Sequence, residues 1–121
     1  MPNNALIIVA HGSRKESSNS EIMHLGEKVK ALVEADYDFV KTAFLEFSEP
    51  SLEESINDCV KKGLKEIIIL PYFLASGNHV SRDIPIIIEK MEIIYPDVKL
   101  ALKEHLGSSN GMAALLSSMA L

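Results

Sequence analysis

The chain has 121 residues, 47% of them hydrophobic and 24% charged, which is the composition of an ordinary globular protein and not of a disordered or repetitive one. This length allows one hydrophobic core, so we expect a single domain over residues 1–121. Seventeen acidic and twelve basic residues give a net charge of −5, with no stripe of lysine or arginine, which argues against nucleic acid as a partner.

Cysteine content and hydropathy indicate the cellular compartment of the protein. Cys59 is the only cysteine, which excludes an intramolecular disulfide and a cysteine-based zinc cluster and fits a reducing environment. The N-terminal segment has no basic residues, and its apolar run is too short for the core of a signal peptide. No stretch approaches the roughly 18 apolar residues of a membrane span, so no membrane association is expected. We expect a cytoplasmic protein.

The chain alternates apolar runs of strand length with amphipathic stretches of helical length. Starting with a strand, we expect strands and helices in turn at residues 5–10, 18–35, 39–47, 51–63, 67–70, 85–95, 98–102 and 111–120. Ser51 and Glu54 fit a capping box at the start of the second helix, and Gly63 suits its end. Strands that are apolar on both faces are typical of parallel sheets covered by helices. The pattern predicts a three-layer α/β fold, with a parallel four-stranded sheet in the order 2-1-3-4 and right-handed crossovers.

Two histidines come where buried strands end. His11 follows the first strand, and His79 follows the third, in the loop or in an irregular first turn of the next helix. Ligands of open α/β sheets gather at the carboxyl ends of the strands, and strands 1 and 3 are expected to be neighbours. Either histidine alone is more often a capping residue, but the pair could converge on one metal ion or one substrate.

Glu46 lies near the end of the second predicted strand, between two phenylalanines. A carboxylate in such a position is costly to bury unless it has a partner or a chemical task. Glu49 competes with it, but a place near the start of the next helix gives Glu49 a structural role. Two neutral imidazoles and one carboxylate suit Co²⁺, Ni²⁺, Fe²⁺ or Zn²⁺, and the ligand types do not choose among these ions.

Arg14 and Arg82 are the only arginines, and each follows one of the two histidines by three residues. An acidic chain must attract an anion locally, so this repeated spacing indicates an anion site. Three other positions are weaker candidates for a functional role. His105 follows the fourth strand and is either at the same rim or a solvated loop residue. His24 is expected to be exposed, and Cys59 is expected to be a buried, inert thiol.

Three motifs, in this order and spacing, resemble the class II tetrapyrrole chelatases. They are Ala-His-Gly-Ser-Arg at 10–14, Phe-Leu-Glu-Phe at 44–47, and Pro-Tyr-Phe-Leu at 71–74 followed by Gly-Asn-His-Val at 77–80 and Asp-Ile-Pro at 83–85. The chain is similar to the short CbiX-type sirohydrochlorin chelatases over about residues 5 to 95. The resemblance is weaker beyond residue 100, where His105 stands in place of a proline that is frequent in similar proteins, so no catalytic role is carried over there.

This resemblance implies that the chain inserts a divalent metal into sirohydrochlorin. We expect Co²⁺ or Ni²⁺ in preference to Fe²⁺, and no organic cofactor. His11 and His79 would hold the metal, and Glu46 or one of the histidines would accept the pyrrole protons. The carboxylates of sirohydrochlorin would be bound by the arginines and by loop hydroxyl, amide and backbone N–H groups. The residues expected in this role are Ser13, Arg14, Ser76, Gly77, Asn78, Ser81 and Arg82.

The resemblance also implies a homodimer. Larger relatives carry two such α/β units with the active site between them, so two copies of this chain would face each other across a shared cleft. The apolar segment at 112–121 either contributes to that contact or packs on its own sheet. Two alternatives stay open: a metal or tetrapyrrole carrier without turnover, and a phosphoryl-transfer enzyme with His11 as nucleophile.

Overall fold

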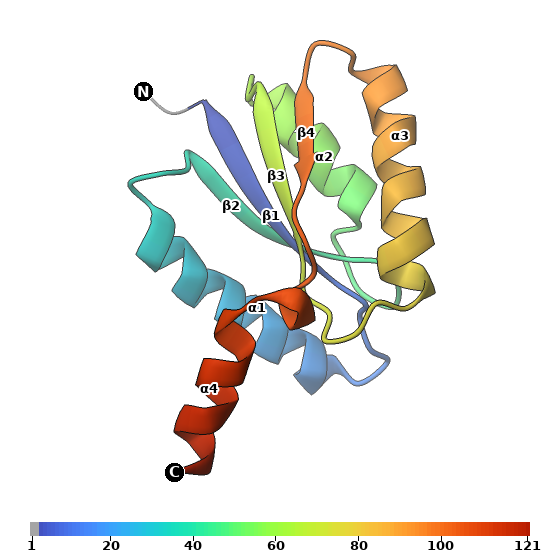
Figure 1. Cartoon of the computed structure of the whole chain (residues 1–121). Helices are drawn as coiled ribbons and strands as arrows, with labels where there is room; N and C mark the ends of the chain where they lie inside the picture. The colour runs from blue at the N-terminus through green and yellow to red at the C-terminus, as the bar shows by residue number, and fades with distance from the viewer. Residues whose placement is uncertain (1–2) are drawn as a thin grey trace.

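A computed structural model describes residues 3–121, and within them strands and helices alternate in the predicted order (Figure 1). The strands are β1 (Asn4–Ala10), β2 (Phe39–Phe44), β3 (Glu66–Pro71) and β4 (Lys99–Leu102). The helices are α1 (Glu16–Val33), α2 (Leu52–Lys61), α3 (Ile84–Ile94) and α4 (Gly111–Ala120), with a π-helical turn η1 (His79–Asp83) and a 3₁₀ turn η2 (Leu106–Ser108). The four strands are parallel and lie in the order β2-β1-β3-β4, which confirms the predicted topology.

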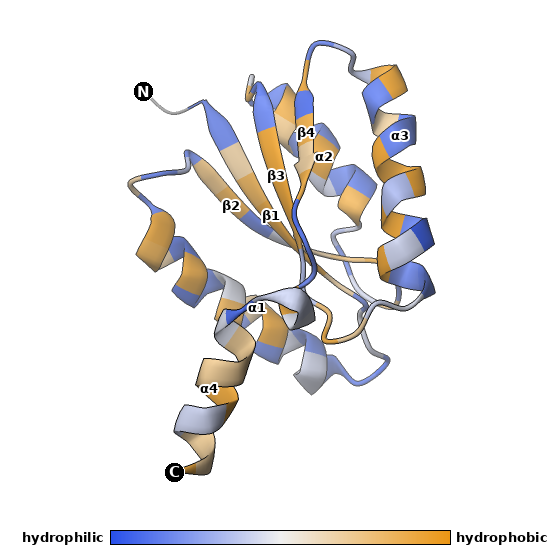
Figure 2. Ribbon diagram, viewed as in Figure 1, coloured by the Kyte–Doolittle hydropathy of each residue, from blue (hydrophilic) through white to orange (hydrophobic). Residues whose placement is uncertain are grey.

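The two faces of the sheet are covered by different helices. On one face, Ile7 of β1 and Ile67 of β3 pack with α2 and α3 in the main hydrophobic core. On the other face α1 crosses the sheet, and Gly26 of this helix lies so close to Thr42 that a Cβ would come 2.1 Å from the threonine hydroxyl. β1, between β2 and β3, is no more than 5% exposed from Ala5 to Ala10, as expected of a central strand covered on both sides. Its neighbour β3 is hydrophobic along most of its length (Figure 2).

The second helix has the predicted capping box. The Ser51 hydroxyl accepts a hydrogen bond from the Glu54 backbone N–H at 3.1 Å, and the Glu54 carboxylate accepts one from the Ser51 N–H at 2.9 Å. The second of these bonds contributes most to lowering the pKa of Glu54. Gly63, after the end of α2, has φ +82° and donates its N–H to the Val60 carbonyl. The signals at both ends of this helix were therefore correctly identified.

The second strand is shorter than predicted. β2 ends at Phe44, because the Phe44 N–H donates to the Pro50 carbonyl and the chain turns back at Phe47, which has φ +64°. The expectation of a strand to residue 47 was wrong, since Phe47 continues the apolar pattern while its backbone is left-handed. Glu46 accordingly lies in a turn.

The third helix begins before Pro85. The π-helical turn η1 runs directly into α3, so His79 occupies an irregular first turn, one of its two predicted locations.

The C-terminal helix forms where it was predicted but does not pack on its own sheet. α4 extends away from the other elements, and apart from the half-buried Met112 its residues are exposed (Figure 1). No helix within residues 3–121 is both long and apolar enough to cross a membrane.

The buried cysteine leads to a first prediction. Cys59 is fully buried in α2, and burial raises the pKa of its thiol to about 11, so at pH 8 roughly one thiol in a thousand is ionised. We expect iodoacetamide to leave the native protein unmodified, as followed by mass spectrometry, and to modify it fully in guanidinium chloride. Labelling of the native protein at the rate of the unfolded one would contradict the packing of α2.

Candidate metal centre

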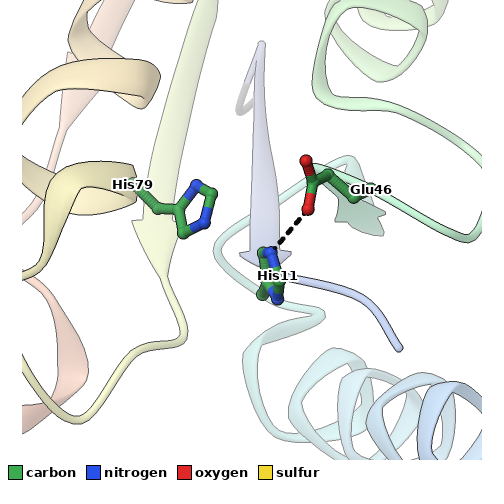
Figure 3. A group of neighbouring side chains, drawn as sticks. All are labelled: His11, Glu46 and His79. Carbon is green, nitrogen blue, oxygen red and sulfur yellow. Dashed lines mark hydrogen bonds and ion pairs between the residues drawn. The ribbon is translucent and has the colours of Figure 1, made fainter. Parts of the chain in front are cut away.

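Three side chains from separate segments converge at the carboxyl edge of the sheet. His11 directly follows β1, Glu46 lies in the turn after β2, and His79 begins the π-helical turn that follows β3 (Figure 3). One potential ligand atom from each residue lies within 4.8 Å of the others. The convergence expected for these three residues is therefore present, and their donors are two imidazoles and one carboxylate.

His11 and Glu46 form a direct pair. Nε2 of His11 lies 2.8 Å from Oε2 of Glu46 (Figure 3), and the two side chains are 41% and 51% exposed. The cost of burial does not apply to Glu46, since the early end of β2 leaves its side chain about half exposed. Its pairing with His11 places it in the three-residue group.

His79 has its own carboxylate partner. Nδ1 of His79 lies 2.8 Å from Oδ2 of Asp83, four residues later in the same turn. A carboxylate at Nδ1 favours the tautomer that carries its proton there and leaves the Nε2 lone pair free for a ligand. The two imidazole rings lie near each other, with centroids 4.4 Å apart. Sequence reasoning did not assign Asp83 to the site, although an acidic residue one turn after a histidine is a signal that could have found it.

Backbone contacts hold Glu46 beside His11. The Glu46 N–H donates to the His11 carbonyl at 2.9 Å, which extends the pairing of the two strands past their ends. Gly12 has φ +95°, and a Cβ at this position would lie 1.8 Å from the Glu46 carbonyl oxygen. Only glycine fits such a conformation and such a close approach.

A buried asparagine fixes the loop that follows His11. Asn19 is 4% exposed, donates through Nδ2 to the Ser13 carbonyl at 2.7 Å and accepts from the Ser13 N–H at 2.8 Å. This reciprocal pair links the loop to the start of α1. Nothing in the sequence pattern distinguished Asn19 from the other polar residues of this helix.

The remaining candidates lie in the two loops and the turn that flank the three side chains. The Arg14 guanidinium carbon lies 5.0 Å from the centre of the Phe47 ring, and the Ser81 hydroxyl donates to the Gly77 carbonyl at 3.0 Å. Neither Arg14 nor Arg82 forms an ion pair within residues 3–121. The exposed candidates are Arg14, Ser76, Gly77, Asn78, Ser81 and Arg82, while Ser13 is half-buried.

Beside His11, a cavity of about 660 Å³ lies between the β1–α1 loop and α1, with Ser13, Asn19 and Tyr72 among its lining residues. His24 is exposed, as predicted, and His105 lies outside the three-residue group.

The fold and this group define an α/β protein with a two-histidine, one-carboxylate centre at the open edge of a parallel sheet. The CbiX family model matches residues 5–120, so the chain belongs to the CbiX family.

Relatives of this chain are named as chelatases of different metals. The sirohydrochlorin cobaltochelatase of Methanococcus maripaludis is 43% identical over 81 residues, which are 67% of this chain and 55% of that protein. The chloroplastic sirohydrochlorin ferrochelatase of Arabidopsis thaliana is 41% identical over 81 residues, 66% of this chain and 35% of that protein. The match thus spans about half the length of the methanococcal relative and a third of the plant one.

A solved structure resembles the whole chain. The crystal structure of a CbiX protein from Marinobacter aquaeolei VT8 superposes with a TM-score of 0.82 at 27% identity. The match covers 97% of this chain and 93% of that one. The two chains therefore share their fold over nearly their full lengths.

The close backbone approach at Gly12 leads to a second prediction. Gly12→Ala forces a Cβ into the Glu46 carbonyl at a positive φ, and we expect it to lower the free energy of unfolding by about 2 kcal/mol or more. Gly77→Ala is the matched control, because no atom lies within 4 Å of its added Cβ. We expect this control to stay within about 0.5 kcal/mol of the unchanged protein in urea unfolding. Equal stabilities for the two variants would contradict the contact.

Proposed function

We propose that this chain catalyses the insertion of a divalent metal ion into sirohydrochlorin. The observation that carries the proposal is the convergence of His11, Glu46 and His79, whose ligand atoms lie within 4.8 Å of one another at an open edge of the sheet. Membership of the CbiX family supports it, because relatives at about 40% identity are named as chelatases of this tetrapyrrole.

The arrangement suits metal insertion chemically. An incoming ion must lose water, and two pyrrole protons must leave the macrocycle. The Nε2 of His79, with Nδ1 held by Asp83, is available to bind the ion on one face of the ring. Glu46, 2.8 Å from His11, is positioned to accept a proton directly or through that imidazole. Since the paired side chains are about half exposed, a flat macrocycle can approach them from outside.

We propose Co²⁺ as the principal metal substrate, with Ni²⁺ as a second and Fe²⁺ as a third. The name of the methanococcal relative supports cobalt, and that of the plant relative supports iron. A site with imidazole and carboxylate donors accepts all three ions, so the preference for Co²⁺ rests on the similarity to the methanococcal relative. Comparing insertion rates for the three metals on one tetrapyrrole tests it.

We propose that the carboxylates of the substrate bind around the metal site. Arg14 and Arg82 support this, because both are exposed and form no ion pair within residues 3–121. The net charge of −5 makes such local attraction necessary. The other groups in this role are Ser13, Ser76, Gly77, Asn78 and Ser81, which lie in the flanking loops and on η1.

We further propose that residues 1–121 act as one α/β unit in the cytoplasm and form a homodimer. The exposure of His11 and Glu46 supports a second copy, because a partner facing this edge would enclose the site in a shared cleft.

Histidine variants test the proposed reaction. We expect His11→Ala and His79→Ala each to lower the initial rate of Co²⁺ insertion by about 100-fold or more, measured from the absorbance change of sirohydrochlorin, because each removes a metal-binding or proton-transfer group. His105→Ala is the matched control, outside the three-residue group, and should stay within about twofold of the unchanged protein. Circular dichroism should be the same for all variants.

Two results would contradict this function. Full activity in either His11→Ala or His79→Ala would remove the residue from the mechanism. Tight binding of sirohydrochlorin and Co²⁺ by the unchanged protein, without any increase over the uncatalysed insertion rate, would instead identify a carrier.

Asp83 is expected to act as a positioning residue through His79. Asp83→Ala should weaken Co²⁺ binding by about 10- to 100-fold in calorimetric titration, and Asp83→Asn, which keeps a hydrogen-bond acceptor, should fall in between. Asp97→Ala, which removes an exposed carboxylate from the loop before β4, should bind Co²⁺ as the unchanged protein does. A lowered melting temperature with unchanged Co²⁺ affinity in Asp83→Ala would indicate a purely structural role.

A further inference from the structure

Phe47 is an exposed aromatic residue in a strained backbone conformation. Among residues 3–121 it is the only residue other than glycine with a positive φ, +64°. Glycine adopts this left-handed region freely, whereas a bulky side chain makes it costly in free energy. Burial does not offset this cost, because Phe47 is 51% exposed. Residues held in such conformations gather at active sites and ligand clamps, where the surrounding structure maintains them.

Backbone hydrogen bonds place Phe47 at the rim of the candidate metal centre. The Ser48 N–H donates to the Glu46 carbonyl at 2.8 Å, so the chain turns sharply across Phe47. The Glu46 N–H donates in turn to the His11 carbonyl, which ties this turn to the end of β1. As a result, the centroid of the Phe47 ring lies 6.0 Å from that of His11, and the two rings are perpendicular.

Phe47 also holds Arg14 beside the same histidine. The guanidinium carbon of Arg14 lies 5.0 Å from the centre of the Phe47 ring, which is a cation–π contact. A planar guanidinium in this position keeps N–H groups free at its edge for a carboxylate. Arg14 is exposed and forms no ion pair within the described residues. The two side chains therefore present an accessible aromatic ring and a cation side by side.

A tetrapyrrole joins the same two kinds of surface. Its macrocycle is flat and conjugated, and its peripheral carboxylates are anions. When the centre of the macrocycle lies at a metal ion bound by His11, the surrounding pyrrole rings extend over the neighbours of this histidine, and Phe47 is one of them. Two aromatic systems attract each other in stacked and in edge-to-face arrangements, so the exposed part of the Phe47 ring suits either contact.

We propose that Phe47 contacts the substrate: its ring packs against the tetrapyrrole macrocycle, while Arg14, held over that ring, binds a peripheral carboxylate. The strained backbone is retained because it brings the ring to the rim of the site. The inference rests on the proposed function for the identity of the tetrapyrrole. It adds a residue that recognises the macrocycle and takes no part in binding the metal.

Fluorescence titration of metal-free sirohydrochlorin with the full chain tests this role. We expect Phe47→Gly, which removes the ring and relieves the positive φ, to weaken tetrapyrrole binding by about 10-fold or more. Phe47→Tyr keeps an aromatic ring and should stay within about threefold of the unchanged protein. Ile94→Ala is the matched control, because Ile94 is 52% exposed but lies at the end of α3 that leads back to the start of β4. This control should bind as the unchanged protein does.

Three further measurements separate a substrate contact from a structural role. Co²⁺ affinity in calorimetric titration should change by less than about twofold in Phe47→Gly, because His11, Glu46 and His79 are all retained. The melting temperature should be no lower than that of the unchanged protein, because glycine adopts this φ without steric cost. Arg14→Gln should weaken tetrapyrrole binding less in the Phe47→Gly background than alone, because the ring that holds the guanidinium is then absent.

Other outcomes overturn the inference. Unchanged tetrapyrrole binding by Phe47→Gly excludes the contact, and additive effects of Phe47→Gly and Arg14→Gln exclude the coupling of the two side chains. Weaker binding of both tetrapyrrole and Co²⁺, with a lower melting temperature, identifies a structural role for Phe47. A changed mass of Phe47→Gly in sedimentation assigns the ring to a contact between copies of the chain.

Failure of the proposed function gives a different result. A protein that binds sirohydrochlorin through Phe47 but does not accelerate metal insertion contradicts the chelatase activity and leaves the contact standing. An unchanged protein that does not bind sirohydrochlorin contradicts both.

Discussion

The parallel pairing of β1 with both β2 and β3 is the constraint on which the site depends. Because the three strands run in one direction, their carboxyl ends reach the same edge, and residues 35 and 68 positions from His11 arrive beside it. Burial of β1 on both faces is what its central place between β2 and β3 requires. The convergence of His11, Glu46 and His79 thus depends on the central core, although the three side chains are themselves partly exposed.

Much of the fold follows from local patterns. Runs of apolar residues identified the strands, and the capping box and Gly63 identified the ends of α2. These signals can be recognised because they depend only on neighbours in the sequence. The end of β2 was missed because Phe47 is apolar, as a strand residue would be, while its backbone is left-handed. The path of α4 was not decided by sequence because an apolar helix can cover its own sheet or another surface.

Part of the candidate site could also be predicted from local patterns in the sequence. His11 and His79 stand at strand ends, and the topology alone brings them together. Asp83 and Asn19 act through contacts that have no distinctive pattern, an ion pair within one turn and a reciprocal backbone clamp on Ser13. Glu46 was selected from the cost of burying a carboxylate between phenylalanines, whereas the structure leaves it about half exposed and paired with His11. Supporting residues of this kind can be identified only from the three-dimensional structure.

The two sides of the candidate metal centre differ in the room that they leave for larger side chains. On the His11 side, Gly12 touches the Glu46 backbone, so any larger residue there would disturb two of the three converging side chains at once. On the His79 side, the loop at 76–78 is exposed, and Gly77 has open space around it. Substitutions are therefore expected to be tolerated in the exposed loop at 76–78, whereas the turn at Gly12 accepts no larger side chain.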